Sequence, residues 1–235
     1  MRVRRPLLEG TFVARENRFR ARVRLGGKAV AAHVPNSGRL RELLCPDQPV
    51  LLAEAASPHR LTDYDLVMVS LPHTLVSIDA RLPNKLFDEA VADGALREFE
   101  GYSVVRREVT YGNSRLDFLL EADGDSRSCL VEVKSVTLVQ EGIGRFPDAV
   151  TERGARHLDE LRRASLGGKR TAVVFVIQRG DAQAFAPHDE SDPRFGEVLR
   201  EAALDGVGIH AYACAVNRRE IRVSDSLPVL LERDT

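Results

Sequence analysis

Two carboxylates and a lysine in the middle of the chain lie in two short apolar runs that read as β-strands. Residues 114–120 read Ser-Arg-Leu-Asp-Phe-Leu-Leu, and residues 130–134 read Leu-Val-Glu-Val-Lys. Side chains alternate between the two faces of a β-strand, so Glu132 and Lys134 share one face while the valines around Glu132 face the core. Mg²⁺ prefers hard oxygen ligands from one or two carboxylates, completed by water and phosphate. These residue types therefore favour metal-assisted phosphodiester chemistry.

The contribution of Asp117 depends on how these two runs pair. Residues 122–126 read Ala-Asp-Gly-Asp-Ser, which predicts a turn and hence an antiparallel hairpin. If the turn centres on Gly124-Asp125, Asp117 lies opposite Glu132, with Cβ atoms about 5 Å apart. Two carboxylates this close repel each other unless one is protonated or a cation lies between them. Mg²⁺ (or Mn²⁺) is the cation we expect there.

The presence of a lysine at position 134 favours a metal-dependent site over an ordinary strand with one solvated face. The run Val-Glu-Val-Lys also fits any half-buried strand with one solvated face. Only Lys28, Lys85, Lys134 and Lys169 are lysines among the 34 basic residues of the chain. Such an arginine-rich chain would be expected to place arginine at a merely solvated position. Lysine, unlike arginine, shifts its pKa readily and can handle a proton.

The net charge of −1 conceals a strongly basic N-terminal part. Residues 1–41 contain ten arginines and Lys28 against only Glu9 and Glu16, which leaves the remainder of the chain acidic. Such asymmetry predicts that the basic part meets a polyanion. Nucleic acid, most plausibly DNA, is the partner we expect, because charge neutralisation dominates nucleic-acid affinity.

The arginines of this basic part follow a strand pattern. Residues 18–25 alternate between arginine and apolar residues, and Gly26-Gly27 predicts a hairpin with residues 28–34. No carboxylate on that partner strand would neutralise the row. Asn17 could add a polar contact and Phe19 a base-stacking surface, although Phe19 is expected in the core. A merely solvated face is the alternative to phosphate contact. The predicted contact residues in this row are Arg18, Arg20, Arg22 and Arg24.

The pattern of elements predicts two domains, at residues 1–80 and 81–235. In the first, strands at 50–54, 65–71 and 75–79 and a short helix at 38–44 join the hairpin in a small barrel, for which an OB-fold is the natural candidate. The second alternates helices and strands in an α/β layer structure. Its predicted helices are 84–93, 150–164 and 194–205, and its strands are 102–111, 115–121, 129–137, 171–178, 207–214 and 219–223.

Other sequence features indicate the cellular compartment and argue against disulfide bonds and zinc sites. Three widely spaced cysteines in apolar runs, Cys45, Cys129 and Cys214, predict buried reduced thiols. Neither a signal peptide nor a membrane-spanning segment is found, so we expect a cytoplasmic protein without a membrane partner. None of the six histidines has zinc-ligand spacing to another histidine or cysteine. His157 is expected to be structural or solvent-facing.

Several separated segments form a recognisable set along nearly the whole chain. They read Arg-Glu-Asn-Arg-Phe at 15–19, His-Val-Pro-Asn-Ser-Gly-Arg-Leu at 33–40, Ser-Arg-Leu-Asp-Phe at 114–118, Val-Glu-Val-Lys-Ser-Val-Thr-Leu at 131–138, Thr-Glu-Arg-Gly at 151–154 and Val-Ile-Gln-Arg at 176–179. Together these segments resemble the sugar fermentation stimulation protein A family. The resemblance implies an N-terminal OB-fold joined to a restriction-endonuclease-like PD-(D/E)XK domain that binds DNA.

The resemblance also implies site residues. Its nuclease-type centre corresponds to Asp117, Glu132 and Lys134, with Glu89 of the preceding helix as a fourth member and Gln178 as a polar residue near the metal. Leu116 replaces the proline of the PD signature, a position that often varies. Arg15 and Arg39 lie in the matching N-terminal segments and join the predicted nucleic-acid contacts.

These features together predict a Mg²⁺-dependent phosphodiesterase that binds nucleic acid. Asp117 and Glu132 would hold the metal, and Lys134 would act on the attacking water and the transition state. One alternative is a non-catalytic DNA-binding regulator of sugar metabolism genes. Another is a protein-interaction module whose basic strand docks on an acidic partner. A homodimer is possible, because nucleases that cut both strands are often dimers.

Overall fold

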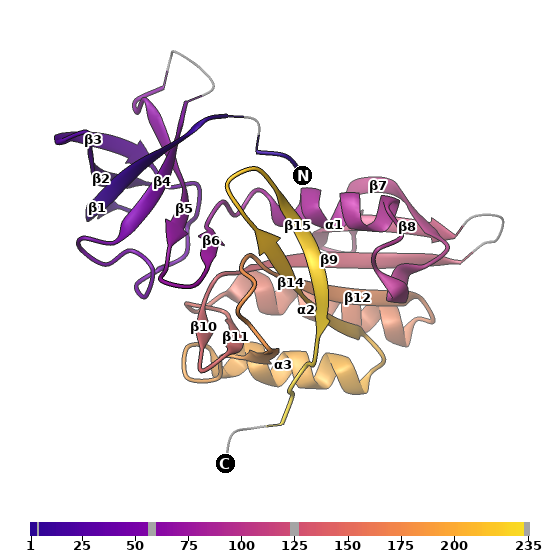
Figure 1. Ribbon diagram of the computed structural model, residues 1–235. Helices are drawn as coiled ribbons and strands as arrows, with labels where there is room; N and C mark the ends of the chain where they lie inside the picture. Colours follow the sequence, from indigo (N-terminus) through magenta and orange to yellow (C-terminus); the bar gives the residue numbers. More distant parts are fainter. Residues whose placement is uncertain (4, 56–59, 123–126, 233–235) are drawn as a thin grey trace.

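The computed structural model describes residues 1–3, 5–55, 60–122 and 127–232 (Figure 1). Six strands of the N-terminal part form a sheet in the order β3-β2-β1-β4-β5-β6, and a parallel pairing of β3 with β5 closes it into a barrel. The sheet is antiparallel elsewhere. Its strands are β1 (Leu7–Asn17), β2 (Arg20–Leu25), β3 (Lys28–His33), β4 (Pro49–Glu54), β5 (Tyr64–Ser70) and β6 (Leu75–Ser77).

The β2–β3 hairpin of this barrel follows from the alternation of arginine and apolar residues in the sequence. Arg20, Arg22 and Arg24 pair with His33, Ala31 and Ala29, as predicted, while Ala21 and Val23 between them are fully buried. Gly26 and Gly27 form the turn with φ of 55° and 81°, a conformation that glycine adopts without steric cost.

Three expectations for the N-terminal part are wrong. Residues 38–44 form turns and no helix, and Leu40 has a φ of 51°, which is outside the helical region. Phe19 is 48% exposed and does not enter the core. Cys45 is exposed, although Cys129 and Cys214 are buried as expected.

A second six-stranded sheet, in the order β15-β14-β12-β9-β8-β7, forms the centre of the C-terminal part. β9 and β12 are parallel neighbours, as are β12 and β14, and the outer pairs are antiparallel. The strands are β7 (Tyr102–Tyr111), β8 (Ser114–Ala122), β9 (Ser128–Val136), β12 (Arg170–Ile177), β14 (Gly208–Val216) and β15 (Ile221–Leu227). β12 is buried from Thr171 to Ile177, which confirms the predicted central strand.

Helices cover both faces of this sheet, as Figure 1 shows. On one face α1 (Pro83–Ala92) packs Leu86 and Phe87 against Val131 and Val133. On the other face lie α2 (Glu152–Leu166) and α3 (Pro193–Leu204). A short 3-10 helix, η1, spans Arg97–Phe99, and a small sheet contains β10 (Val139–Gln140), β11 (Ile143–Phe146) and β13 (Ala184–Pro187).

The start of α2 differs from the prediction. The helix begins at Glu152, and Thr151 caps it by accepting the N–H of Gly154. Val150 therefore precedes the helix and is 68% exposed, although the sequence placed it on the apolar side.

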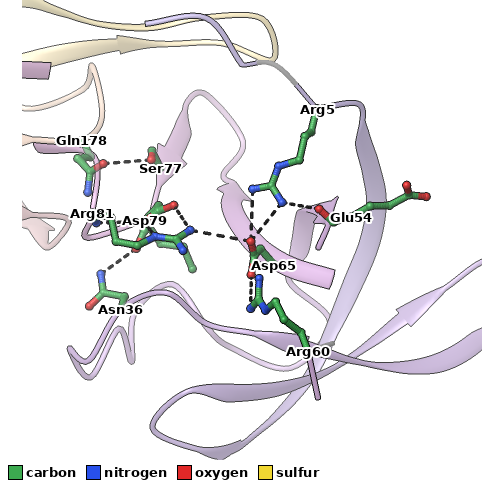
Figure 2. Close-up of polar contacts among 10 residues, drawn as sticks. Arg5, Asn36, Glu54, Arg60, Asp65, Ser77, Asp79, Arg81 and Gln178 are labelled. Carbon is green, nitrogen blue, oxygen red and sulfur yellow. Dashed lines mark hydrogen bonds and ion pairs between the residues drawn. The ribbon is translucent and has the colours of Figure 1, made fainter. Parts of the chain in front are cut away.

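Polar contacts connect the barrel with the second sheet. Ser77 at the end of β6 donates from its hydroxyl to Gln178 Oε1 at 3.1 Å, and its N–H donates to the carbonyl of Gln178 (Figure 2). Met1 and Val3 donate backbone hydrogen bonds to the carbonyls of Ile221 and Arg219. The first residues thus lie against β15, and the proposed division of the chain at residue 80 remains a prediction.

Candidate metal and nucleic-acid site

The β8–β9 hairpin brings Asp117 and Glu132 to one place. The two strands pair antiparallel from Glu121↔Ser128 to Phe118↔Val131, the register predicted from the sequence, although the turn at 123–126 lies outside the described residues. The ladder ends at this pair, one residue before Asp117 and Glu132. There the carboxylate of Asp117 accepts the N–H of Val133 at 2.8 Å, and its other oxygen accepts Nδ2 of Asn84 from α1 at 2.9 Å.

Glu132 is buried, with 3% of its surface exposed, and its two oxygens differ. Oε1 accepts Lys134 Nζ at 2.6 Å and contacts His157 Nδ1 at 2.5 Å. Oε2 has no hydrogen-bond partner among the described residues. A buried carboxylate oxygen without a partner is costly, so this atom indicates a ligand that supplies positive charge.

The two carboxylates have opposite pKa shifts. Burial, and next the negative charge of Glu132, raise the pKa of Asp117 above its usual value. Burial also acts to raise the pKa of Glu132, but the hydrogen bonds from His157 and Lys134 outweigh it, so this pKa lies below its usual value. A cation between the two groups would relieve the repulsion that Asp117 experiences.

This donor set fits Mg²⁺ or Mn²⁺. Both ions prefer oxygen ligands, and Mg²⁺ is usually bound by one or two carboxylates together with water and phosphate. Within the described ranges no group of three or more His, Cys, Asp and Glu side chains could hold a metal. An ion bound by the oxygens of Asp117 and Glu132 would therefore need water or phosphate as its remaining ligands.

His157 contacts Glu132, a role that was not predicted from the sequence. This side chain lies in α2 and is 3% exposed. Arg153 Nε donates to its Nε2 at 3.3 Å, so Nδ1 carries the hydrogen that is donated to Glu132. His157 adjoins Leu158 on the buried face of the helix. A polar residue on an apolar helix face is the signal that could have identified it.

Substitution of His157 is expected to weaken metal binding through Glu132. In His157→Ala the carboxylate loses one of its two donors, which should lower the free energy of unfolding by about 1–3 kcal/mol and weaken Mn²⁺ binding measured by calorimetry. His157→Asn places an amide donor near the position of Nδ1, so it should restore part of the stability and part of the Mn²⁺ affinity. His157→Gln should restore neither. Equal Mn²⁺ affinity in all four proteins would contradict this role.

Glu89 and Gln178 have polar partners other than Asp117 and Glu132. Glu89 in α1 forms an ion pair with the amino group of Met1 at 2.7 Å, and Asn84 is the α1 residue that reaches Asp117. Gln178 is fully buried. Its Nε2 donates to Ser135 Oγ at 3.0 Å, so it joins Ser77 of the barrel to β9.

Gln178→Leu tests whether this residue acts on the fold or on the metal. Ser77 and Ser135 would lose their partner, and we expect the free energy of unfolding to fall by about 1–3 kcal/mol. The increase in melting temperature on adding Mn²⁺ should stay as large as in the wild type. Loss of that increase in a folded Gln178→Leu protein would instead place Gln178 at the metal, as the resemblance implied.

The predicted nucleic-acid contacts divide into paired and unpaired arginines. Glu16, in a bulge of β1, forms ion pairs with Arg20 at 2.8 Å and Arg22 at 2.6 Å. Arg24 pairs with Asp47 at 3.0 Å. Carboxylates from outside the partner strand thus neutralise most of the row. In the described part of the chain, Arg18 and Arg39 have no carboxylate within ion-pair distance.

Arg15 and Asn17 stabilise the loops beside this row. The Arg15 guanidinium donates to four backbone carbonyls, those of Arg18, Asn36, Gly38 and Arg39. Asn17 Oδ1 accepts the N–H of Phe19 at 2.9 Å. Both residues therefore shape the surface that carries the exposed arginines.

Two family models together match most of the chain. The model described as "SfsA N-terminal OB domain" matches residues 13–78, and the model described as "Sugar fermentation stimulation protein RE domain" matches residues 81–220. The chain belongs to the sugar fermentation stimulation protein (SfsA) family. Its fold is accordingly an OB barrel followed by a restriction-endonuclease-like domain.

Relatives of this family match over nearly their full length. The sugar fermentation stimulation protein homolog of Symbiobacterium thermophilum is 50% identical, with 96% of each chain covered. The homolog of Caldanaerobacter subterraneus subsp. tengcongensis is 42% identical over 98% of this chain and all of the relative. Among solved structures, SfsA of Pyrococcus furiosus in complex with Ca²⁺ matches with a TM-score of 0.88 and 31% identity, over 98% of this chain and 99% of that one.

Proposed function

We propose that this protein binds nucleic acid, with DNA as the expected substrate, and hydrolyses phosphodiester bonds with the help of Mg²⁺ or Mn²⁺. The observation that carries the proposal is the partnerless buried oxygen of Glu132 in a site that also contains Asp117 and Lys134. A protein that only binds nucleic acid would gain affinity without carboxylates at this place.

Each residue of the site has a chemical task in this proposal. Asp117 and Glu132 would hold the metal, which when bound polarises the phosphate and lowers the pKa of water. His157 and Lys134 both hold Oε1 of Glu132, which leaves Oε2 available. Lys134, with a side chain 11% exposed, would orient the attacking water and offset negative charge in the transition state.

Two further observations support a polyanionic substrate and a divalent ion. Residues 1–41 are strongly basic, and OB barrels commonly bind oligonucleotides. The Pyrococcus furiosus relative is a complex with Ca²⁺, an ion that shares the oxygen-ligand preference of Mg²⁺. No helix among the described residues is long and apolar enough to span a membrane. The homodimer remains a prediction.

A cleavage assay tests the proposal. The purified protein is incubated with end-labelled DNA and RNA, each single- and double-stranded, in the presence of Mg²⁺, Mn²⁺ or EDTA. We expect products with Mg²⁺ or Mn²⁺ and none with EDTA. Binding without cleavage under every metal condition would support the regulator, and absence of binding to any of these nucleic acids would contradict both.

A further inference from the structure

Two hollows meet at the loop of the barrel at 36–38. One, of about 280 Å³, passes between the loop at 36–38 and the loop at 145–151 and reaches Ser135, which directly follows Lys134. The other, of about 670 Å³, lies over Arg39 and Arg41. Both are lined by Arg18, Ser37, Gly38, Ala149 and Val150, so they form one continuous depression, which we term the loop groove.

The walls of the loop groove are held together across the two domains. Asp148 accepts the backbone N–H of Arg39 at 2.6 Å, and a Cβ on Gly38 would lie 2.5 Å from the same carboxylate. Arg15 fixes the other side of this loop through its four bonds to carbonyl oxygens. The groove is therefore formed before any ligand binds, which reduces the entropic cost of binding.

The charges of the loop groove favour an anion. Arg18, Arg39 and Arg41 are exposed, and no carboxylate in the described ranges lies within ion-pair distance of them. Among the described residues that line the groove, Asp148 is the one acidic side chain, and it accepts the backbone N–H of Arg39. The arginines at 20, 22 and 24, by contrast, already have carboxylate partners.

An aromatic pair of an exposed Phe19 and a half-buried His33 adjoins Arg18, which lines the groove. Phe19 directly follows Arg18 and is 48% exposed, and its ring stacks on His33 with centroids 6.2 Å apart and an interplanar angle of 28°. Exposed aromatic rings beside basic residues are how proteins that bind single strands stack unpaired bases. Within a duplex the faces of the bases are covered by their neighbours, so this pair favours a strand with unpaired bases.

We propose that the loop groove binds one single strand of nucleic acid and guides it toward Lys134, with Arg39 and Arg41 contacting phosphates and Phe19 stacking on a base. This inference rests on the proposed function and specifies its substrate class. The volumes of the hollows, 280 and 670 Å³, are those of pockets for small ligands. They suit a few nucleotides of a single strand.

Binding measured with EDTA, so that no cleavage occurs, tests this inference. Fluorescein-labelled 20-mers are used, one a single-stranded oligothymidine and one a duplex, with anisotropy recorded at several salt concentrations. For the double variant Arg39→Ala/Arg41→Ala we expect at least about tenfold weaker binding of the single strand. The slope of log affinity against log salt should fall by about 1.4, since each phosphate contact on a single strand contributes about 0.7.

Matched variants distinguish binding in the loop groove from non-specific attraction to the positive charge of the protein. Arg20→Ala/Arg22→Ala removes the same charge, but from arginines paired with Glu16, and should weaken binding by less than about threefold. Phe19→Ala should weaken binding about tenfold, and Phe19→Tyr should restore it. Melting temperatures within about 2 °C of the wild type would show that these surface variants are folded.

The inference fails if the duplex binds as tightly as the single strand, or if Arg39→Ala/Arg41→Ala binds like the wild type. In either case cleavage by the wild-type protein with Mn²⁺ would leave the proposed nuclease activity intact and place the nucleic acid elsewhere. A wild-type protein that neither binds nor cleaves any probe overturns both proposals.

Discussion

Lys134→Met is expected to reduce the cleavage rate by about 10²- to 10⁴-fold while nucleic-acid affinity changes by less than about threefold. The reason is that Lys134 donates to Glu132 at 2.6 Å and would act on the water and the transition state rather than on binding. Single-turnover cleavage of end-labelled DNA with Mn²⁺, together with anisotropy in EDTA, measures the two quantities separately.

Two further variants control this experiment. Lys134→Arg should not rescue cleavage, because arginine stays protonated and has a different shape and reach. Lys85→Met, which removes an exposed lysine of α1, should cleave like the wild type. Cleavage by Lys134→Met at the wild-type rate would mean that Lys134 only neutralises Glu132.

Asp117→Asn is expected to abolish stabilisation by metal. If Mn²⁺ is present at about 100 times its Kd, ligand linkage adds about 2.7 kcal/mol to the free energy of unfolding. For a chain of this size the melting temperature then rises by about 5–10 °C. The variant should show no such rise, because the asparagine offers the ion no negative charge. Differential scanning calorimetry with and without Mn²⁺ measures the effect.

The increase in melting temperature on adding Mn²⁺ can be checked with a control variant and at several pH values. Glu89→Gln removes a carboxylate that pairs with Met1 and should retain the full increase; loss of the increase would make Glu89 the fourth member that the resemblance implies. A proton competes with the metal for Asp117, whose pKa lies above its usual value. The increase should therefore shrink as the pH falls through that pKa. An unchanged increase in Asp117→Asn would contradict the proposed ligand.

Local patterns in the sequence were sufficient to predict the hairpins of both domains. Side-chain alternation depends on neighbours along one strand, so the burial of Ala21 and Val23 and the pairing of Arg22 with Ala31 followed from the sequence. The register of β8 with β9, in which Leu119 pairs with Leu130, followed in the same way.

Contacts between distant segments could not be predicted in this way. Glu16 neutralises Arg20 and Arg22 because of a bulge in β1, and a bulge of this kind leaves little signal in the sequence. His157 and Asn84 reach the carboxylates from helices on opposite faces of the sheet. Only the packing of these layers determines which polar side chains meet.

The most direct test of the central claim is an anomalous difference map from a crystal of the protein soaked in Mn²⁺. We predict a peak within about 2.5 Å of a carboxylate oxygen of both Asp117 and Glu132, the latter through the partnerless Oε2. A map without a peak at this pair, from crystals in which Mn²⁺ occupies other sites, would contradict a metal-dependent centre here.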